Sequence, residues 1–180
     1  PVHIADARRF VSQCERSYDL IVMDAFSGDA VPAHLLSKES FAMFAEHVRP
    51  EGALILNLVT VVGGGPTDAT TAVLRTLQEV FPQVRPFCWR RLDAEPAAAN
   101  VLILALKDDR HVDVAGEGRL ATGPMAWYVQ MALGNELAPP MANAVVLTDD
   151  HNPIDLLLTQ SAEIWRRDIL ADESLEMLLR

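Results

Sequence analysis

The chain has 180 residues, half of them hydrophobic, and a formal net charge of −10. Its length and apolar content suffice for one folded domain with its own core. No apolar run approaches the ~20 residues that span a bilayer, and no basic and apolar leader opens the chain, so we expect a cytoplasmic protein rather than a membrane protein. The acidic balance, with few and scattered Lys and Arg residues, argues against a nucleic acid partner. A negative field would instead attract a small-molecule amine such as a polyamine.

Strands and helices alternate along the first half of the chain. Residues 18–24 form a short apolar run that ends on an acid, which is typical of a strand buried on both faces. Asp6 and Ser37 are suitable N-cap residues for the helices that follow them. The elements predicted before residue 82 are helices over 7–14, 38–48 and 68–81 and strands over 18–24 and 53–59.

The second half of the chain begins with two further strands, over 84–89 and 100–106, which form a predicted terminal hairpin. We therefore expect an α/β fold with a mostly parallel sheet, to which the C-terminal hairpin adds one antiparallel strand at the edge. Residues 125–133 and 163–179 have the pattern of helices. The cysteines, Cys14 and Cys88, stand alone in the sequence, which predicts buried free thiols rather than a disulfide or a metal site.

Several segments carry a family resemblance. Residues 18–36 read YDLIVMDAFSGDAVPAHLL, and residues 48–52 read VRPEG. Residues 4–10, IADARRF, and residues 147–153, LTDDHNP, agree in order and spacing. Together these segments resemble the spermidine synthase family, and most closely its bacterial spermidine synthase-like proteins.

The resemblance implies a Rossmann-like domain of the type found in class I S-adenosylmethionine-dependent methyltransferases. It also implies a cofactor, decarboxylated S-adenosylmethionine or S-adenosylmethionine, which would lie at the carboxyl ends of the parallel strands. Open α/β sheets place their ligands at that edge on physical grounds. The family's glycine-rich turn and the acid-ended strand after it have no counterpart here, and the triplet at 63–65 lacks the required glycine spacing. We expect weak or absent cofactor binding by this chain alone.

We accordingly expect one partial domain over residues 1–180 that lacks the first strands of the usual seven-stranded sheet. Residues 1–107 would form the core sheet and helices, and residues 108–180 a C-terminal extension packed on them. A sheet without its first strands exposes an edge and an apolar face, so we also expect a homo-oligomer.

The resemblance assigns the catalytic role to Asp24, which would accept a proton from the attacking amine, as a nearby carboxylate can do. The alternative is that Asp24 only caps the following loop. In the family a second acid follows three residues later, where this chain has Ser27, and Asp29 lies two residues further on. Ser27 and Asp29 are therefore the candidate substrate-binding residues of an altered site, although ordinary turn chemistry is the preferred interpretation of Asp29.

The resemblance also assigns Asp6 and Ala7 to the adenine of the cofactor, because a carboxylate is a suitable acceptor for an exocyclic amine. A helix N-cap is an equally good interpretation of Asp6. Asp149, Asp150 and His151 are a candidate metal-binding cluster, but a tight turn before a helix at Ile154 accounts for them better. We expect no metal.

The function that follows is a spermidine synthase-like transferase that moves an aminopropyl or methyl group from the sulfonium of its donor to an amine. Its chemistry depends on orienting the reactants in line and on keeping the amine unprotonated. The alternative is a non-catalytic Rossmann-like relic or oligomerisation module, since a fold does not carry its function along. An esterase is disfavoured because the chain contains no G-x-S-x-G motif.

Overall fold

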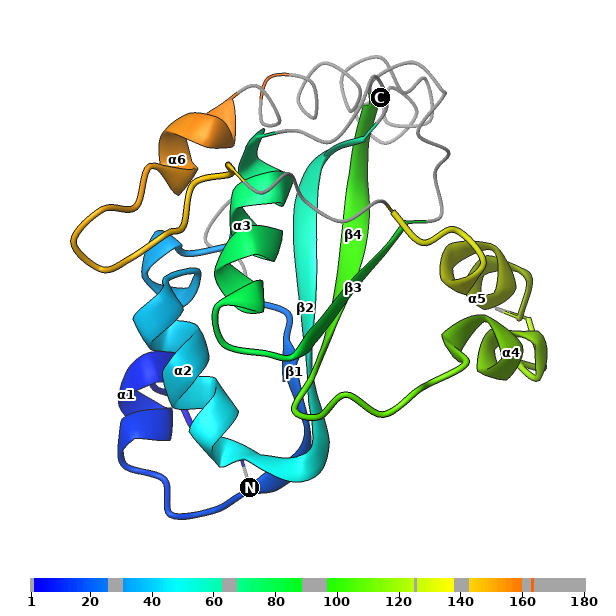
Figure 1. Cartoon of the computed structure of the whole chain (residues 1–180), viewed down its shortest axis with the longest axis horizontal. Coiled ribbons are helices and arrows are strands. Elements are labelled where there is room, and N and C mark those ends of the chain that lie inside the picture. Colours follow the sequence, from blue (N-terminus) through cyan, green and yellow to red (C-terminus); the bar gives the residue numbers. More distant parts are fainter. Residues whose placement is uncertain are drawn as a thin grey trace, which may run out of the picture.

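The computed structural model describes residues 2–25, 31–62, 68–88, 97–124, 126–137, 143–159 and 163. Its strands are β1 (Tyr18–Met23), β2 (Val48–Val62), β3 (Gln83–Cys88) and β4 (Ala97–Leu106). They form one sheet in the order β1-β2-β4-β3 (Figure 1). β1 is parallel to β2, and β4 is antiparallel to both β2 and β3, so β1, β2 and β3 share one direction. The fold is the α/β, Rossmann-like type expected from the sequence, with β3 and β4 as its antiparallel hairpin.

The position of β4 differs from the expected one, because β4 does not lie at the edge of the sheet. It is inserted between β2 and β3, and pairs with β2 along the whole stretch from Ala53 to Val62. In this position both edges of β4 are hydrogen-bonded, and its Val101 and Ile103 side chains are fully buried. The outer edge of β3 is met instead by a later segment, where the Leu137 N–H donates to the Pro86 carbonyl at 2.8 Å.

The helices lie on both sides of the sheet. Figure 1 shows α1, α2 and α3 on one side, with α6 against α3, and α4 and α5 on the other side. Their bounds are α1 (Ala7–Ser12), the 3₁₀ helix η1 (Ala33–Leu35), α2 (Lys38–His47), α3 (Asp68–Gln78), α4 (Val114–Arg119), α5 (Ala126–Leu133) and α6 (Ile154–Leu157). None of the described helices is long and apolar enough to cross a bilayer.

Local sequence signals explain where the first two helices begin. The Asp6 carboxylate accepts from the Arg9 N–H at 3.0 Å, and the Ser37 hydroxyl accepts from the Ser40 N–H at 3.2 Å, which confirms both predicted N-caps. α4 was not predicted from the sequence. Two glycines lower its helix propensity, and its first turn depends on Asp113, whose carboxylate accepts from the Gly116 N–H at 2.8 Å.

The core lies between the sheet and the helices α2 and α3. On β2, the side chains of Leu54, Leu56 and Leu58 point to this side and are fully buried. α3 turns its apolar face to this core, since Val73, Leu74, Leu77 and Phe81 are all buried in the same cluster and Val80 packs against it. The alternation of β2 therefore places its odd-numbered positions, including Asn57, on the opposite face of the sheet.

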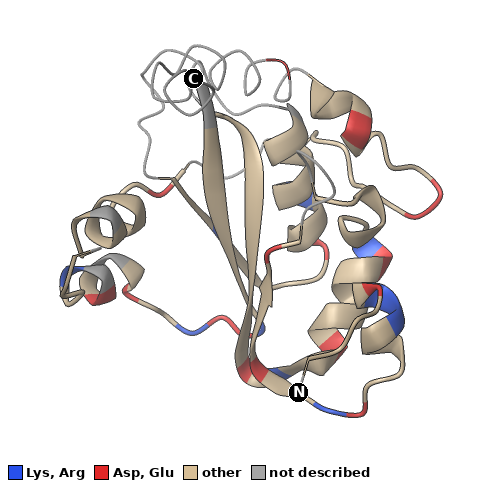
Figure 2. Ribbon diagram, turned by 180° about the vertical axis from the view of Figure 1, so that it is seen from behind, with Lys and Arg blue, Asp and Glu red and all other residues tan. Residues whose placement is uncertain are grey.

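That opposite face, called here the open face, is partly exposed. Leu20 is 50% exposed, Val22 59% and Leu102 39%, although all three are apolar strand residues. The expectation that the first strand is buried on both faces is therefore wrong for the described structure. β1 is an outer strand of this sheet, and its open face meets solvent. Figure 2 shows that charged residues lie mainly on the helices and at the strand ends, so the middle of the sheet carries few charges.

Some predicted features lie outside the described residues. These are the loop that contains Ser27 and Asp29, the glycine triplet at 63–65, the last residue of the strand predicted over 84–89, and the helix predicted over 163–179 except for Glu163. Cys14 and Cys88 form no disulfide bond, and Cys88 is buried as expected, whereas Cys14 is partly exposed.

Candidate active site

Asp24 directly follows β1, and its carboxylate is held by a residue of the next strand. In the parallel register Met23 pairs with Leu56, so Asp24 and Asn57 are the next positions along the two strands. The Asn57 Nδ2–H donates to Asp24 Oδ1 at 2.9 Å. Asp24 is therefore at the carboxyl end of a parallel strand, which is the edge where open α/β sheets bind ligands.

Asn57 has a second polar partner. Its Oδ1 accepts from the Asn100 Nδ2–H of β4 at 2.8 Å. Sequence reasoning missed both asparagines. The available signal was the amide at position 57 in an otherwise apolar run, ALILNLV, because a polar residue within a strand needs a partner.

The Asp24 carboxylate accepts its hydrogen bond from the Asn57 side chain, and residues 26–30 of the loop that it would cap lie outside the described residues. The general-base role of Asp24 and the substrate roles of Ser27 and Asp29 stay predictions.

Both carboxylate oxygens of Asp6 have partners. Oδ1 caps α1, and Oδ2 lies 2.7 Å from Nε2 of His34 in η1. The pKa of Asp6 is lowered, first by the Arg9 N–H and then by the hydrogen bond with His34. The N-cap interpretation is thus confirmed. The adenine-binding role of Asp6 and Ala7 stays a prediction, and it requires an adenine amine to share an oxygen with one of these donors.

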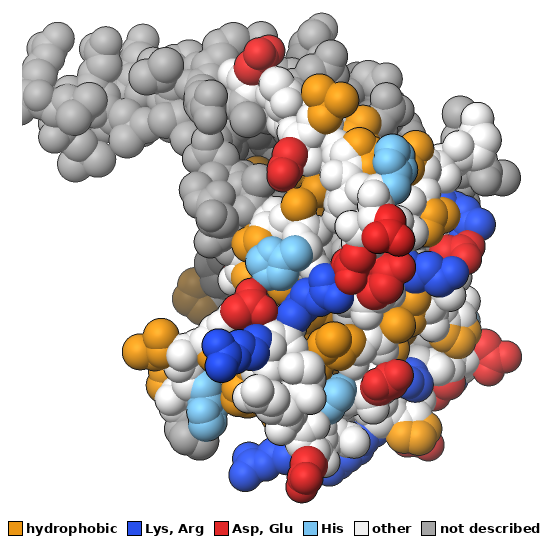
Figure 3. All heavy atoms as spheres, turned by 90° about the vertical axis from the view of Figure 1, so that its left-hand side faces the viewer, with side chains coloured by type: hydrophobic (Ala, Val, Ile, Leu, Met, Phe, Trp, Pro, Cys, Tyr) orange, Lys and Arg blue, Asp and Glu red, His pale blue; other side chains and the backbone are white. Residues whose placement is uncertain are grey.

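Residues 147–153, the C-terminal segment of the family resemblance, are held against α1 and α2 through Asp149. Arg8 donates to both Asp149 oxygens at 2.8 Å, and the Ser37 hydroxyl donates to Oδ1 at 2.5 Å. These hydrogen bonds, from Arg8 first and Ser37 second, lower the pKa of Asp149 to about 2. The Asp149 N–H in turn donates to the Glu39 carboxylate at 2.9 Å. Figure 3 shows this side of the molecule, where acidic, basic and histidine side chains gather.

The residues after Asp149 form the predicted turn. Backbone hydrogen bonds link Thr148 and His151 in both directions, at 3.0 and 3.2 Å. The Asn152 side chain accepts from the Ile154 N–H and donates to the Ala33 carbonyl at 2.8 Å. Within the described residues no group of three His, Cys, Asp or Glu side chains is arranged to hold a metal ion. Through Asn152, residues 147–153 therefore connect the start of α6 to η1.

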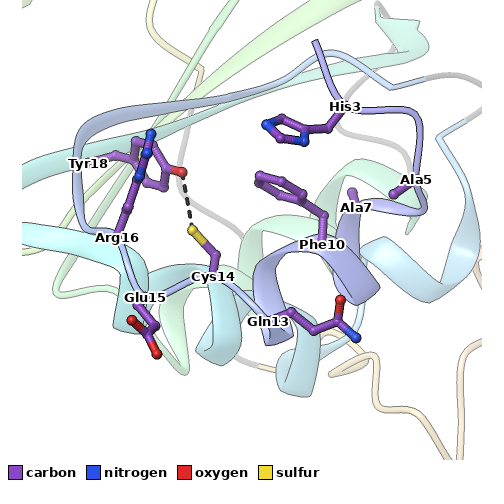
Figure 4. Close-up of a pocket in the computed structure, with 9 residues that line it drawn as sticks. All are labelled: His3, Ala5, Ala7, Phe10, Gln13, Cys14, Glu15, Arg16 and Tyr18. Carbon is purple, nitrogen blue, oxygen red and sulfur yellow. Dashed lines mark hydrogen bonds between the residues drawn. The ribbon is translucent and has the colours of Figure 1, made fainter. Parts of the chain in front are cut away.

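A hollow of about 990 Å³ lies beside α1 and the start of β1 (Figure 4). Its walls include the His3 and Phe10 rings, whose centroids are 5.0 Å apart, and Ala7. The Cys14 sulfur lies 3.3 Å from the Tyr18 hydroxyl, a contact that lowers the pKa of the thiol.

The hollow and Asp24 are different places. The hollow reaches Tyr18, at the first position of β1, whereas Asp24 follows its last. Six steps of extended strand separate the two residues by about 20 Å. Ala7 therefore lies in the wall of the hollow. Asp24 is about 20 Å away from Tyr18, another residue of that wall.

No family model matches the chain. It is 24% identical, over 97% of its length, to a probable polyamine aminopropyl transferase of Bifidobacterium longum, and 25% identical, over 60% of its length, to a polyamine aminopropyltransferase of Nitrosomonas europaea. It spans 41% and 31% of these relatives. Its structure is similar to that of a probable spermidine synthase from Corynebacterium glutamicum, with a TM-score of 0.58 and 17% identity over 82% of this chain and 53% of that one.

The sheet order, the helices on both sides of the sheet and the structural similarity define a Rossmann-like α/β fold. The chain is thus similar to polyamine aminopropyltransferases in sequence and to a spermidine synthase in fold, which agrees with the resemblance found in the sequence.

Proposed function

We propose that this chain provides the general base of a spermidine synthase-like transferase, a carboxylate that accepts a proton from the amine substrate. The substrate would be a small-molecule amine such as a polyamine, and the donor decarboxylated S-adenosylmethionine or S-adenosylmethionine. The observation that carries the proposal is Asp24, which follows a parallel strand and is held by Asn57 at 2.9 Å. The names of the two aminopropyltransferase relatives favour aminopropyl over methyl transfer.

The reaction requires an unprotonated amine. Its nitrogen attacks the carbon bonded to the sulfonium, the C–S bond breaks, and the sulfur leaves as a neutral thioether. The nitrogen then carries a positive charge and loses a proton, which the Asp24 carboxylate accepts. The negative charge of Asp24 also stabilises the developing cation, and the net charge of −10 favours the approach of a cationic polyamine.

The test is a transfer assay on the full-length gene product that contains these 180 residues. Putrescine or spermidine is mixed with either donor, and the products are followed by mass spectrometry. Methylthioadenosine would report aminopropyl transfer, and S-adenosylhomocysteine would report methyl transfer. We expect methylthioadenosine, and expect Asp24→Asn to suppress it.

Asp19→Asn is the matched control, because Asp19 lies near the other end of the same strand, is 82% exposed and pairs with Arg49 on the surface. It should leave the rate unchanged. If neither product forms with any amine, the non-catalytic module is the better account of the chain.

A further inference from the structure

Three polar side chains form a continuous line across the sheet. Asn100 of β4 donates to Asn57 of β2 at 2.8 Å, and Asn57 donates to Asp24 at the end of β1 at 2.9 Å. Each bond joins neighbouring strands, so the line reaches from the acid to a strand that does not touch β1. Asn100 is thus two hydrogen bonds from the carboxylate of the proposed base.

The register of the sheet keeps these side chains in place. Asn57 is opposite Leu102 and Asn100 is opposite Val59, so the two asparagines are diagonal neighbours on the open face. Diagonal neighbours in an antiparallel pair are within reach of each other's side chains. β2 is paired on both edges here, to β1 and to β4, which fixes the backbone that carries Asn57.

The chemistry of the amide makes the orientation of Asn57 important. A side-chain amide has an acceptor oxygen on one branch and a donor NH₂ on the other, whereas an ionised carboxylate only accepts. Because Asn100 donates to the Asn57 oxygen, the Asn57 NH₂ is left to face Asp24. A reversed amide would place its oxygen against the carboxylate and its NH₂ against the NH₂ of Asn100, and both hydrogen bonds would be lost.

We propose that Asn100 is a positioning residue for Asp24, and that it acts by fixing the orientation of the Asn57 amide. This role rests on the proposed function. The line of donors holds Asp24 Oδ1. The direction in which the carboxylate presents its other oxygen, Oδ2, to the amine therefore depends on Asn57 and, through it, on Asn100.

The first experiment does not require catalysis. In the ¹⁵N-labelled protein, the Asn57 side-chain amide resonances are recorded with and without Asp24→Asn, which removes the charge that they face. The same comparison is made in an Asn100→Asp background, where the new carboxylate competes for the Asn57 NH₂. We expect the chemical-shift change of the Asn57 amide caused by Asp24→Asn to be at least twofold smaller in the Asn100→Asp background. An equal response in both backgrounds, or none in the wild type, would overturn the proposal.

The second experiment measures kcat and KM for the amine. Asn100→Asp should lower kcat about tenfold and change KM less than twofold, whereas Asn100→Gln, which keeps the donor, should retain most of the rate. An unchanged kcat, or an equal loss with Asn100→Gln, would count against positioning. Gln83→Leu removes a side-chain amide at the far end of the sheet, where it binds the Asp108 and Arg110 carbonyls, and should alter neither measurement. The Asn57 amide could respond to Asp24→Asn as expected in a protein that shows no transfer activity. That result would contradict the proposed function but not the hydrogen-bonded line of Asn100, Asn57 and Asp24.

Discussion

Arg8 precedes Asp149 by 141 positions in the sequence, yet two of its guanidinium nitrogens each approach one oxygen of that carboxylate at 2.8 Å. The same arginine donates to the His34 carbonyl at 3.1 Å. One side chain therefore joins α1, η1 and the C-terminal turn. This geometry is the bidentate one in which an arginine contributes more than an ordinary surface ion pair.

We expect Asp149→Asn to destabilise the fold by about 1 kcal/mol at pH 7, a figure kept low because the pair is partly exposed to solvent. Thermal unfolding should detect it as a fall in Tm of about 2–4 °C. The folded-state pKa of about 2 lies below the ordinary value of 3.8. The contribution of Asp149 is thus fully present above pH ~4 and is lost as the pH falls through about 2. The gap in Tm between wild type and variant should narrow over that range.

Asp150→Asn is the control for this experiment, because it removes the same charge from an exposed neighbour. Its Tm should match that of the wild type across the pH range. If the difference in Tm between wild type and Asp149→Asn stayed constant down to pH 2, Arg8 would not be what keeps the Asp149 carboxylate ionised.

Asp24→Asn should lower kcat/KM about 10²-fold or more in the active full-length protein, because the amide cannot accept the proton of the amine. Asp29→Asn should cost less, since its position departs from that of the family's second acid. Steady-state kinetics and circular dichroism are measured together. Equal losses for the two variants, or unfolding of Asp24→Asn, would make Asp24 a loop-capping residue.

Features set by neighbouring residues were predictable from the sequence. Asp6 and Ser37 cap their helices because an N-cap bond reaches only three residues ahead. Asp24 was placed at a strand end because the strand stops at an acid and a turn.

Features that depend on distant partners were not predictable. The position of β4 between β2 and β3 results from pairing with β2 residues that lie 35 to 53 positions earlier in the chain, from Val62↔Ala97 to Ala53↔Leu106. Asn57 and Asn100 have no individual signature, since their contact exists only in one register of that pairing. The turn around Asp149 was predicted, but its partners Arg8 and Ser37 were not, because they lie more than one hundred positions earlier in the chain.

The isolated chain should bind S-adenosylmethionine and its decarboxylated form weakly or not at all. The sequence contains no spaced glycine-rich turn, and both oxygens of Asp6 already have donors. Isothermal titration calorimetry should give no heat beyond dilution. A dissociation constant at or below ~10 μM, worth about 7 kcal/mol, would contradict this expectation.

The chain should self-associate, because β1 is an outer strand and exposes Leu20 and Val22 on its open face. Light scattering at micromolar concentration should detect a dimer or a larger species. Val22→Lys should shift it towards monomer, whereas Leu120→Lys, at an exposed site after α4, should not. A monodisperse monomer of the unmodified chain would exclude this mode of association.

The place of β4 also has a consequence for synthesis on the ribosome. β3 emerges before β4, yet in the described sheet β4 is the strand on which β3 depends. A nascent chain that stops before Ala97 therefore presents β2 with one bare edge and β3 with no strand beside it. The sheet is complete only after β4 has paired between β2 and β3, which are both synthesised earlier. Pairing between strands far apart in the sequence is slow. Until β4 has paired, the unpaired edges of β2 and β3 can associate with strands of other nascent chains.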